Sequence, residues 1–374
     1  MPMTDLVLVQ THEAADGSLI GHLTLNSERS LNALSLAMVD ALFSQLTAWQ
    51  QDERIQCVLL DGAGDKAFCA GGDIRAMYDA CVEKPGQRVA EVEEFFTKEY
   101  RLDHLIHVYQ KPIVLWGSGI VMGGGVGLMA GASHRVVTET TRMAMPEVSI
   151  GLFPDVGGTY FLNRMPGQCG RFLGMTGYQM NAKDACYVGL ADFAFGSDRR
   201  TQLLDDLKGL NWQSEQSSQL LVSQLLKGYQ DLDSGKLPDT VLGAEQARID
   251  GIFGGDSLDA LVERVAQTTS DDKWLSRALA TMLAGSPITW HLVWDQLKQS
   301  TLNLEQVFQY ELTLAVRCAE MGDFIEGVRA LLIDKDRSPN WRFANAQSVP
   351  AAHIDAMVTP PWSSHPLQQL SKEA

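Results

Sequence analysis

The chain has 374 residues, of which 45% are hydrophobic, so it can bury a sizeable core as one large domain or two ordinary ones. Its formal net charge of −16 and its pI near 4.9 argue against a nucleic-acid groove, which needs concentrated lysine and arginine. An acidic chain can still hold an anionic ligand through a few local cations and helix N-termini.

The cysteines, the histidines and the most apolar segment argue against further classes of protein. The six cysteines show no C-x-x-C spacing and are expected to be reduced thiols, and the eight histidines are scattered, so we predict no metal site. The opening residues MPMTDLVLVQ lack the pattern of a signal peptide, and the apolar segment 119–132 is too short to span a bilayer. We therefore expect a cytoplasmic protein without a membrane or nucleic-acid partner.

The first half of the sequence alternates predicted strands and helices. Apolar runs at 6–9 and 19–25 flank a turn signal at residues 16–17 and predict a β-hairpin. Residues 35–51 carry apolar side chains one helical turn apart and predict a helix capped by Ser35.

Three further strands are predicted along this half. They cover 57–60, 113–116 and 134–137, with a loop over 61–73 after the first and helices from near Asp73 and over 92–107. Strands that alternate with helices after short loops indicate parallel βαβ units, and hence an α/β fold.

The character of the sequence changes near residue 195. Residues 199 to about 333 show repeated helical periods, no convincing strand runs and several glycine breaks. Four prolines follow position 349 and predict an irregular end. We therefore expect an α/β core over 1–195, a helical C-terminal region over 196–345 and an irregular tail over 346–374.

Two glycine-rich segments lie between a strand and a helix, FCAGGD at 68–73 and MGGGVGL at 122–128. Adjacent glycines let the backbone approach a ligand closely, and N–H groups at a helix start point outward as donors. Each segment alone can be a tight turn. Two of them on neighbouring strands favour an oxyanion hole, because a carbonyl oxygen needs two convergent N–H donors.

Two carboxylates lie eight residues apart within the segment 146–158. Glu147 and Asp155 each follow a proline in apolar surroundings. Such surroundings raise the pKa of a carboxyl group toward neutrality, which suits a general acid or base. Alternatively, Asp155 caps a helix and Glu147 lies in a solvent-exposed loop.

Three segments in this order and spacing, KAFCAGGDIRAM, KPIVLWGSGIVMGGGVGL and MPEVSIGLFPDVGGTYFL, closely resemble the crotonase (enoyl-CoA hydratase/isomerase) superfamily. Together with GVRALLIDKDRSPNW at 327–341, they resemble its 3-hydroxyisobutyryl-CoA hydrolase subgroup. The resemblance implies a ClpP/crotonase-like spiral core of ββα repeats with a helical C-terminal region.

The resemblance implies roles for individual backbone and side-chain groups. The N–H groups of Gly72 and Gly124 would form the oxyanion hole, and Ala70 with its neighbour Asp73 would lie along the CoA chain. Glu99 matches a substrate-contacting position of the hydrolases. Candidate contacts for the CoA phosphates, each of which can equally be an ordinary surface cation, are Arg29, Arg75 and Lys335.

The acidic positions distinguish the members of the superfamily. Hydratases of this fold use two acids, of which one matches Glu147 and the other falls at Gly127, which has no side chain. Asp155 supplies a second carboxylate, as in the hydrolase subgroup. Asn32 fits the N-terminal signature and is expected to be structural. Cys69 is not expected to be a nucleophile, because no histidine is predicted beside it.

The implied activity is hydrolysis of a short branched 3-hydroxyacyl-CoA, with 3-hydroxyisobutyryl-CoA of valine breakdown as the main candidate. Coenzyme A is part of the substrate, and no cofactor is expected. Glu147 would attack the carbonyl or activate water, while Asp155 would orient the substrate hydroxyl and relay a proton. The alternatives are a hydratase or isomerase and a non-catalytic CoA-binding subunit. The resemblance also implies a homo-oligomer, commonly a trimer or a dimer of trimers.

Overall fold

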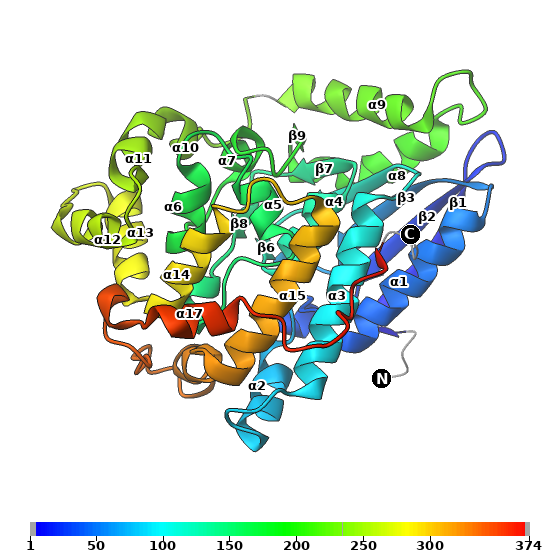
Figure 1. Cartoon of the computed structure of the whole chain (residues 1–374). Helices are drawn as coiled ribbons and strands as arrows, with labels where there is room; N and C mark the ends of the chain where they lie inside the picture. The colour runs from blue at the N-terminus through cyan, green and yellow to red at the C-terminus, as the bar shows by residue number, and fades with distance from the viewer. Residues whose placement is uncertain (1–4, 234, 371–374) are drawn as a thin grey trace.

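The computed structural model describes residues 5–233 and 235–370, and its strands form two sheets (Figure 1). The larger sheet has the order β1-β2-β3-β5-β7-β9, and the smaller has the order β4-β6-β8. Their bounds are β1 Val7–Glu13, β2 Leu19–Leu25, β3 Ile55–Gly62, β4 Ala67–Cys69, β5 Ile113–Gly117, β6 Ile120–Met122, β7 His134–Val137, β8 Arg142–Ala144 and β9 Phe193–Ala194.

The predicted hairpin and the three predicted parallel strands are confirmed. Strands β1 and β2 pair antiparallel, and the other neighbours pair parallel. The prediction that residues 61–73 form one loop is wrong for 67–69, which form β4. The three strands of the smaller sheet have three residues each, too short for an alternating pattern to show in the sequence.

The two sheets are built by a repeated ββα unit, as the resemblance implied. In each repeat the chain forms one strand of the larger sheet, one of the smaller and then a helical turn or helix. Because β4, β6 and β8 are parallel neighbours, the segments that follow them meet at one edge of the smaller sheet. These segments contain both glycine-rich motifs and Glu147.

The helices of the first half include all those predicted. Ser35 caps α1 by accepting the Met38 N–H at 3.3 Å, and Asp73 caps α2 by accepting the Ala76 N–H at 3.2 Å. The helical segments are η2 Glu28–Ser30, α1 Leu36–Gln51, α2 Ile74–Glu83, α3 Ala90–His107, α4 Gly124–Gly131, η3 Glu147–Ile150, α5 Gly158–Leu162, α6 Cys169–Thr176 and α7 Ala182–Tyr187.

The C-terminal region is helical, as predicted. It comprises η4 Ser197–Arg199, α8 Arg200–Gly209, α9 Ser218–Asp233, α10 Val241–Ala244, α11 Gln246–Phe253, α12 Leu258–Gln267, α13 Lys273–Ala284, α14 Pro287–Gln296, α15 Leu304–Met321, α16 Phe324–Val328 and η5 Arg329–Ile333. The tail expected to be irregular holds η6 Ala346–Ser348 and α17 Ala351–Met357. Pro350 precedes α17 at its N-cap, where a proline does not break a helix.

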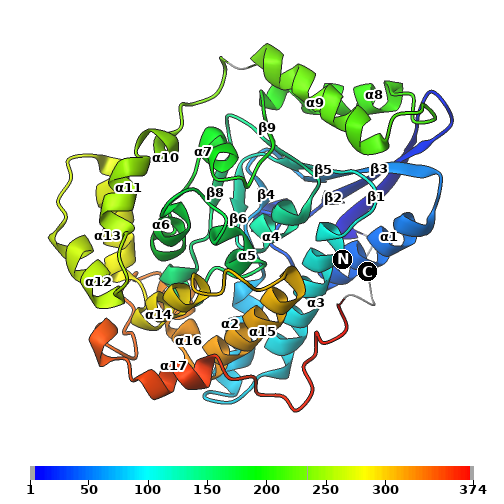
Figure 2. The ribbon, with the colours of Figure 1, turned by 45° about the horizontal axis from the view of Figure 1, so that its top comes forward.

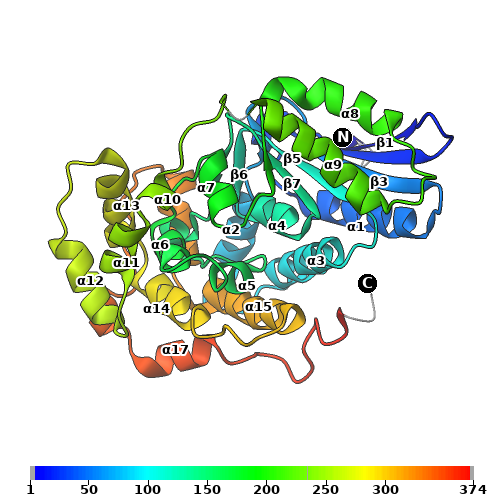
Figure 3. The same cartoon turned by 90° about the horizontal axis from the view of Figure 1, so that it is seen from above.

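Helices from both halves of the sequence cover the larger sheet. Helices α8 and α9 lie over one face, where Leu207 and Leu226 join a cluster with Leu59 and Trp116 (Figure 2). On the other side, α3 packs against α15 (Figures 1 and 3). A second cluster combines side chains from 7–194, 242–328 and 346–370, so the three predicted parts share one core. Within the described ranges, no helix has the length and apolar character to cross a membrane.

The side chain of Asn32 links its own turn, before α1, to the segment that leads into β4. It is fully buried at φ 56°, and its Oδ1 accepts the Ser27 N–H at 2.9 Å. Its Nδ2 donates to the carbonyl oxygens of Ala63 and Ala67, both at 3.0 Å. These contacts support the structural role expected for Asn32.

The substitution N32A is expected to lower the free energy of unfolding by about 2–4 kcal/mol, because it leaves buried polar groups without partners. Urea denaturation measures the change. The control N26A removes one exposed hydrogen bond to Asp5 and is expected to cost less than about 1 kcal/mol. Equal losses for the two variants would contradict the prediction.

Candidate active site

A cavity of about 160 Å³ lies where the strands of the smaller sheet end. It brings together six of the residues implied by the resemblance: Ala70, Gly72, Glu99, Gly124, Glu147 and Asp155. Its other lining residues are Gly71, Ile74, Met77, Phe95, Phe96, Met122, Gly123, Pro146, Ile150, Leu152, Leu331 and Leu332.

The two glycine-rich loops touch at this cavity. A Cβ atom built on Gly71 would lie 3.9 Å from the backbone nitrogen of Gly124, so the loops approach to van der Waals distance. Gly71 and Gly123 have φ of 111° and 49°, which favour glycine. Gly124 is the first residue of α4, where an N–H group has no acceptor within the helix. The arrangement suits binding of a carbonyl oxygen between the Gly72 and Gly124 amides.

Glu99 reaches the cavity from α3 and is only 2% exposed. Its Oε1 has no hydrogen-bond partner among the described residues. A side chain at position 124 would overlap that oxygen, so glycine at 124 leaves room for the carboxyl group. Burial, followed by the charge of Asp155, raises the pKa of Glu99 well above its usual range.

Glu147 begins η3, directly after β8 and Pro146. It is 4% exposed, so it does not lie in a solvent-exposed loop. Its Oε2 has no hydrogen-bond partner in the described part of the chain. Burial, with a smaller contribution from the charge of Asp155, raises the pKa of Glu147 well above its usual range. A buried carboxyl group with a free oxygen beside a cavity is suited to act on a bound molecule.

Asp155 faces the same cavity from the loop before α5. Its Oδ2 accepts a hydrogen bond from the Tyr100 hydroxyl at 2.8 Å, and burial raises the pKa of Asp155 to about 7. The alternative that Asp155 caps a helix does not hold for α5. The first N–H groups of that turn, from Gly157 and Thr159, donate instead to the Glu311 carboxylate, both at 2.7 Å.

The structure adds two acids that sequence reasoning missed. Glu311 of α15 anchors the start of α5, and burial raises its pKa to about 8. Asp103 of α3 is fully buried, and neither of its carboxyl oxygens has a hydrogen-bond partner among the described residues. Its spacing of four residues from Glu99 places both on one face of a helix, and this spacing was a usable signal.

Position 127 has no room for a side chain. A Cβ atom built on Gly127 would lie 2.6 Å from the Cβ of Val156 and 3.1 Å from Oδ1 of Asp103. The second acid that the hydratase pattern requires at this position is therefore absent, and its space is filled by other groups.

The C-terminal region forms one wall of the cavity through Leu331 and Leu332 of η5. Arg329 holds the following turn in place. Its guanidinium contacts the carboxylates of Glu326 at 2.8 Å, Asp334 at 2.6 Å and Asp336 at 2.7 Å. The active site is thus built from both halves of the chain.

Several residues implied by the resemblance lie outside this cavity. Asp73 caps α2 and lines a neighbouring cavity instead. Lys335 is exposed just after η5, and Arg29 is exposed in η2. Arg75 donates to the backbone oxygen of Leu332 at 3.1 Å, which places it beside the cavity wall.

Cys69 does not have the properties of a nucleophile. It is fully buried beneath the first glycine loop, and burial raises the pKa of its thiol to about 12. Among residues 5–233 and 235–370, no group of three histidine, cysteine, aspartate or glutamate side chains is placed to hold a metal ion.

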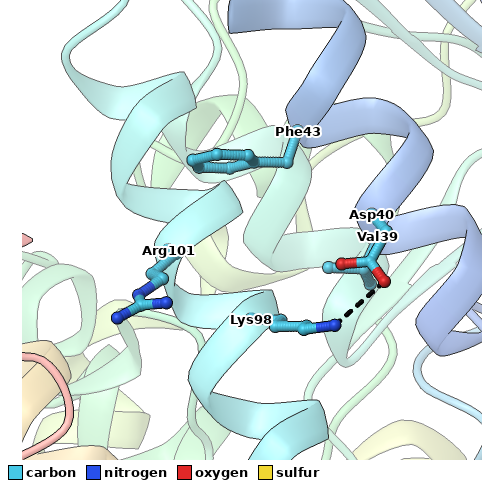
Figure 4. Close-up of a pocket in the computed structure, with 5 residues that line it drawn as sticks. All are labelled: Val39, Asp40, Phe43, Lys98 and Arg101. Carbon is cyan, nitrogen blue, oxygen red and sulfur yellow. Dashed lines mark hydrogen bonds and ion pairs between the residues drawn. The ribbon is translucent and has the colours of Figure 1, made fainter. Parts of the chain in front are cut away.

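A larger cavity of about 440 Å³ lies on the surface between α1 and α3 (Figure 4). Two of its three charged groups pair with each other, since Lys98 Nζ lies 3.0 Å from Asp40 Oδ2. It has no glycine amide and no buried carboxyl group at its lining, which is Val39, Asp40, Phe43, Lys98 and Arg101. We therefore place the chemistry in the smaller cavity.

The substitution D103N is expected to increase stability at neutral pH. Burial, followed by the charges of Glu99, Asp155 and Glu311, raises the pKa of Asp103 well above its usual range. Above about pH 4 the unfolded chain loses this proton while the folded chain retains it, so stability falls as pH rises. Asparagine has no such proton, and each unit of raised pKa corresponds to about 1.4 kcal/mol.

Urea denaturation between about pH 3 and pH 8 measures this difference. The gain from D103N is expected at neutral pH and is expected to shrink below about pH 4. D40N, at a half-exposed carboxyl group paired with Lys98, serves as the control and is not expected to gain stability. A D103N variant no more stable than wild type at any pH would contradict the prediction.

Comparison with known proteins extends over most of the chain. A sequence profile of the enoyl-CoA hydratase/isomerase family matches residues 20–358. The chain is 39% identical over 344 residues to the mitochondrial 3-hydroxyisobutyryl-CoA hydrolase of Gallus gallus, covering 91% of this chain and 86% of that protein. It is 38% identical over 333 residues to the Homo sapiens protein of the same name, with coverage of 88% and 83%.

Two solved structures share the fold along nearly their full lengths. An enoyl-CoA hydratase from Rhodobacter sphaeroides superposes with a TM-score of 0.80 at 32% identity, covering 94% of this chain and 97% of that one. A carnitinyl-CoA dehydratase from Mycobacterium thermoresistibile gives 0.81 at 32% identity, with coverage of 94% and 96%. The profile, the relatives and the ββα architecture agree: the chain belongs to the enoyl-CoA hydratase/isomerase family.

Proposed function

We propose that this chain hydrolyses 3-hydroxyisobutyryl-CoA to 3-hydroxyisobutyrate and coenzyme A. Curated relatives that are 38–40% identical along most of the chain carry this activity in their names. The proposal rests on one observation: Glu147, Asp155, Gly72 and Gly124 all line the same cavity. The reaction consumes water, breaks the C–S bond and needs no further cofactor.

The thioester carbonyl oxygen binds between the Gly72 and Gly124 N–H groups. As the carbonyl carbon becomes tetrahedral, negative charge develops on this oxygen, and both donors stabilise it. Loss of one such donor typically costs about 2.7–4 kcal/mol of activation free energy. The apolar side chains around the amides, among them Phe95 and Met77, exclude water and strengthen this interaction.

Glu147 attacks the carbonyl carbon or removes a proton from the attacking water. Its free Oε2 and its place at the cavity beside the second glycine loop support both routes. Because the pKa of Glu147 is raised, Glu147 is protonated until ionised Asp155 takes up that proton. The Glu147 carboxylate formed in this way is a stronger base and a stronger nucleophile than an exposed carboxylate. In the nucleophilic route, attack by Glu147 expels the thiolate and leaves a mixed anhydride, which water then hydrolyses. A single turnover in ¹⁸O-labelled water reveals this route when water attacks the Glu147 carbonyl, because the label then enters Glu147 and the first acid product keeps an unlabelled enzyme oxygen.

Asp155 and Glu99 bind the 3-hydroxyl group of the substrate. Both line the cavity, and Glu99 Oε1 is free to accept a hydrogen bond. With a pKa near 7, Asp155 exchanges a proton readily in neutral solution. It therefore passes the proton taken from Glu147 to the departing thiolate, which leaves as the free thiol of coenzyme A.

A hydratase is the second candidate, because the two structural neighbours are described as a hydratase and a dehydratase. The closed space at Gly127 disfavours hydration by two cooperating acids. The direct test supplies purified protein with 3-hydroxyisobutyryl-CoA or crotonyl-CoA, and follows thiol release and loss of the enoyl absorbance. Thiol release with negligible hydration is expected. Hydration without thiol release would overturn the proposal.

E147Q and D155N are each expected to lower kcat for thiol release by at least about a hundredfold, the usual contribution of a positioned acid or base. D40N removes a carboxylate of similar size outside the cavity and is expected to retain wild-type activity. Unchanged turnover in both E147Q and D155N would show that the catalytic assignment of these two residues is wrong.

The cellular location of the protein and its association into oligomers stay predictions. The cytoplasmic location expected from the sequence contrasts with the mitochondrial relatives. Association into trimers or hexamers likewise rests on resemblance, and light scattering of the purified chain measures it.

A further inference from the structure

Tyr100 lies directly behind the proposed active site. It belongs to α3, is fully buried, and packs its ring against Phe96 and Phe308 with centroid distances of 5.7 Å. Its hydroxyl group donates to Asp155 Oδ2 at 2.8 Å. Tyr100 does not line the cavity, so its hydroxyl group reaches Asp155 from outside the cavity lining.

The acid that Tyr100 contacts is one of several buried together. The titratable groups around Asp155 are carboxyl groups, a phenol and a thiol. They are Glu99, Tyr100 and Asp103 of α3, Glu147 of η3, and Glu311 and Cys318 of α15. Helix α4 contributes no titratable side chain. His104 follows Tyr100 by one turn of α3 and packs against Phe308. Carboxyl groups this close in an apolar interior cannot all be ionised at once.

Hydrogen bonds distinguish Asp155 from its neighbours. No described residue donates to Glu99 Oε1, to Glu147 Oε2 or to either oxygen of Asp103. Glu311 is committed to the backbone of α5 through both its oxygens. A hydroxyl donor stabilises a carboxylate more than a neutral carboxyl group, so the Tyr100 contact favours charge on Asp155.

We propose that Tyr100 is a positioning residue that selects Asp155 as the carboxyl group that ionises first among these acids and holds it toward the cavity. The inference rests on the proposed function, in which Asp155 acts on the substrate. The pKa near 7 for Asp155, against values well above the usual range for Glu99, Asp103 and Glu147, supports the assignment.

Y100F tests the proposal, because it removes the donor and keeps the ring. Without the donor the ionised form of Asp155 is less stable, so its pKa rises. The limb of the kcat–pH profile near pH 7 is expected to move to higher pH by about one to two units, the usual worth of a hydrogen bond to a charged group. KM is expected to change less than twofold, since Tyr100 does not line the cavity.

Y109F is the matched control. Tyr109 is also buried and donates at 2.8 Å, but its acceptor is the backbone oxygen of Leu46. Y109F is expected to lose stability comparable to Y100F and to keep the wild-type limb. A folded Y100F variant with an unshifted limb overturns the inference, whereas a fully active D155N variant overturns the proposed function.

A second measurement does not depend on the folding of Y100F. Replacing tyrosine throughout the wild-type chain by 3-fluorotyrosine makes the phenol more acidic and a stronger donor without removing its ring. The limb is then expected to move to lower pH, opposite to the shift in Y100F. An unchanged limb in the labelled protein would contradict the selection of Asp155 by Tyr100.

Discussion

The parallel pairing of three short strands is the constraint on which the active site depends. Strands β4, β6 and β8 contribute three residues each, and their alignment places the ends of three successive repeats side by side. The segment after each strand carries one part of the site: Gly72, Gly124 and Glu147 in turn. A shift of one residue in this pairing would separate the two amides from each other and from the carboxylate.

Around this edge the structure buries acids that cannot all be charged. Desolvation and mutual repulsion oppose folding, because the unfolded chain ionises these groups freely near neutrality. The fold tolerates them where backbone N–H groups or a phenol provide donors, as for Glu311 and Asp155. A site that uses protons at neutral pH gains from this arrangement, because the same burial keeps them bound but exchangeable.

The sequence predicted correctly those features that contiguous residues form. The hairpin, the helix capped by Ser35, the two glycine loops and the pair Glu147 and Asp155 are local patterns, and the structure contains each of them. The strands of the smaller sheet were missed because a three-residue strand is defined by its neighbours rather than by its own sequence. Tyr100 and Glu311 were missed as parts of the site because their roles come from contacts between segments far apart in the chain. Asp103 was missed although its spacing from Glu99 indicated a shared helix face. Gly127 was recognised as lacking an acid, but only packing against Val156 shows that no side chain fits.

Leu331 and Leu332 are the last residues along the chain that line the cavity, so the cavity wall is completed late in synthesis. A ribosome that has passed residue 155 has already made every acid and amide of the site except Glu311. The pocket stays open to water until η5 has been synthesised and the charge network around Arg329 has folded its turn against α2. The wall of the cavity is therefore complete only when nearly nine-tenths of the chain exists, so an incomplete nascent polypeptide carries the reactive groups without their full enclosure.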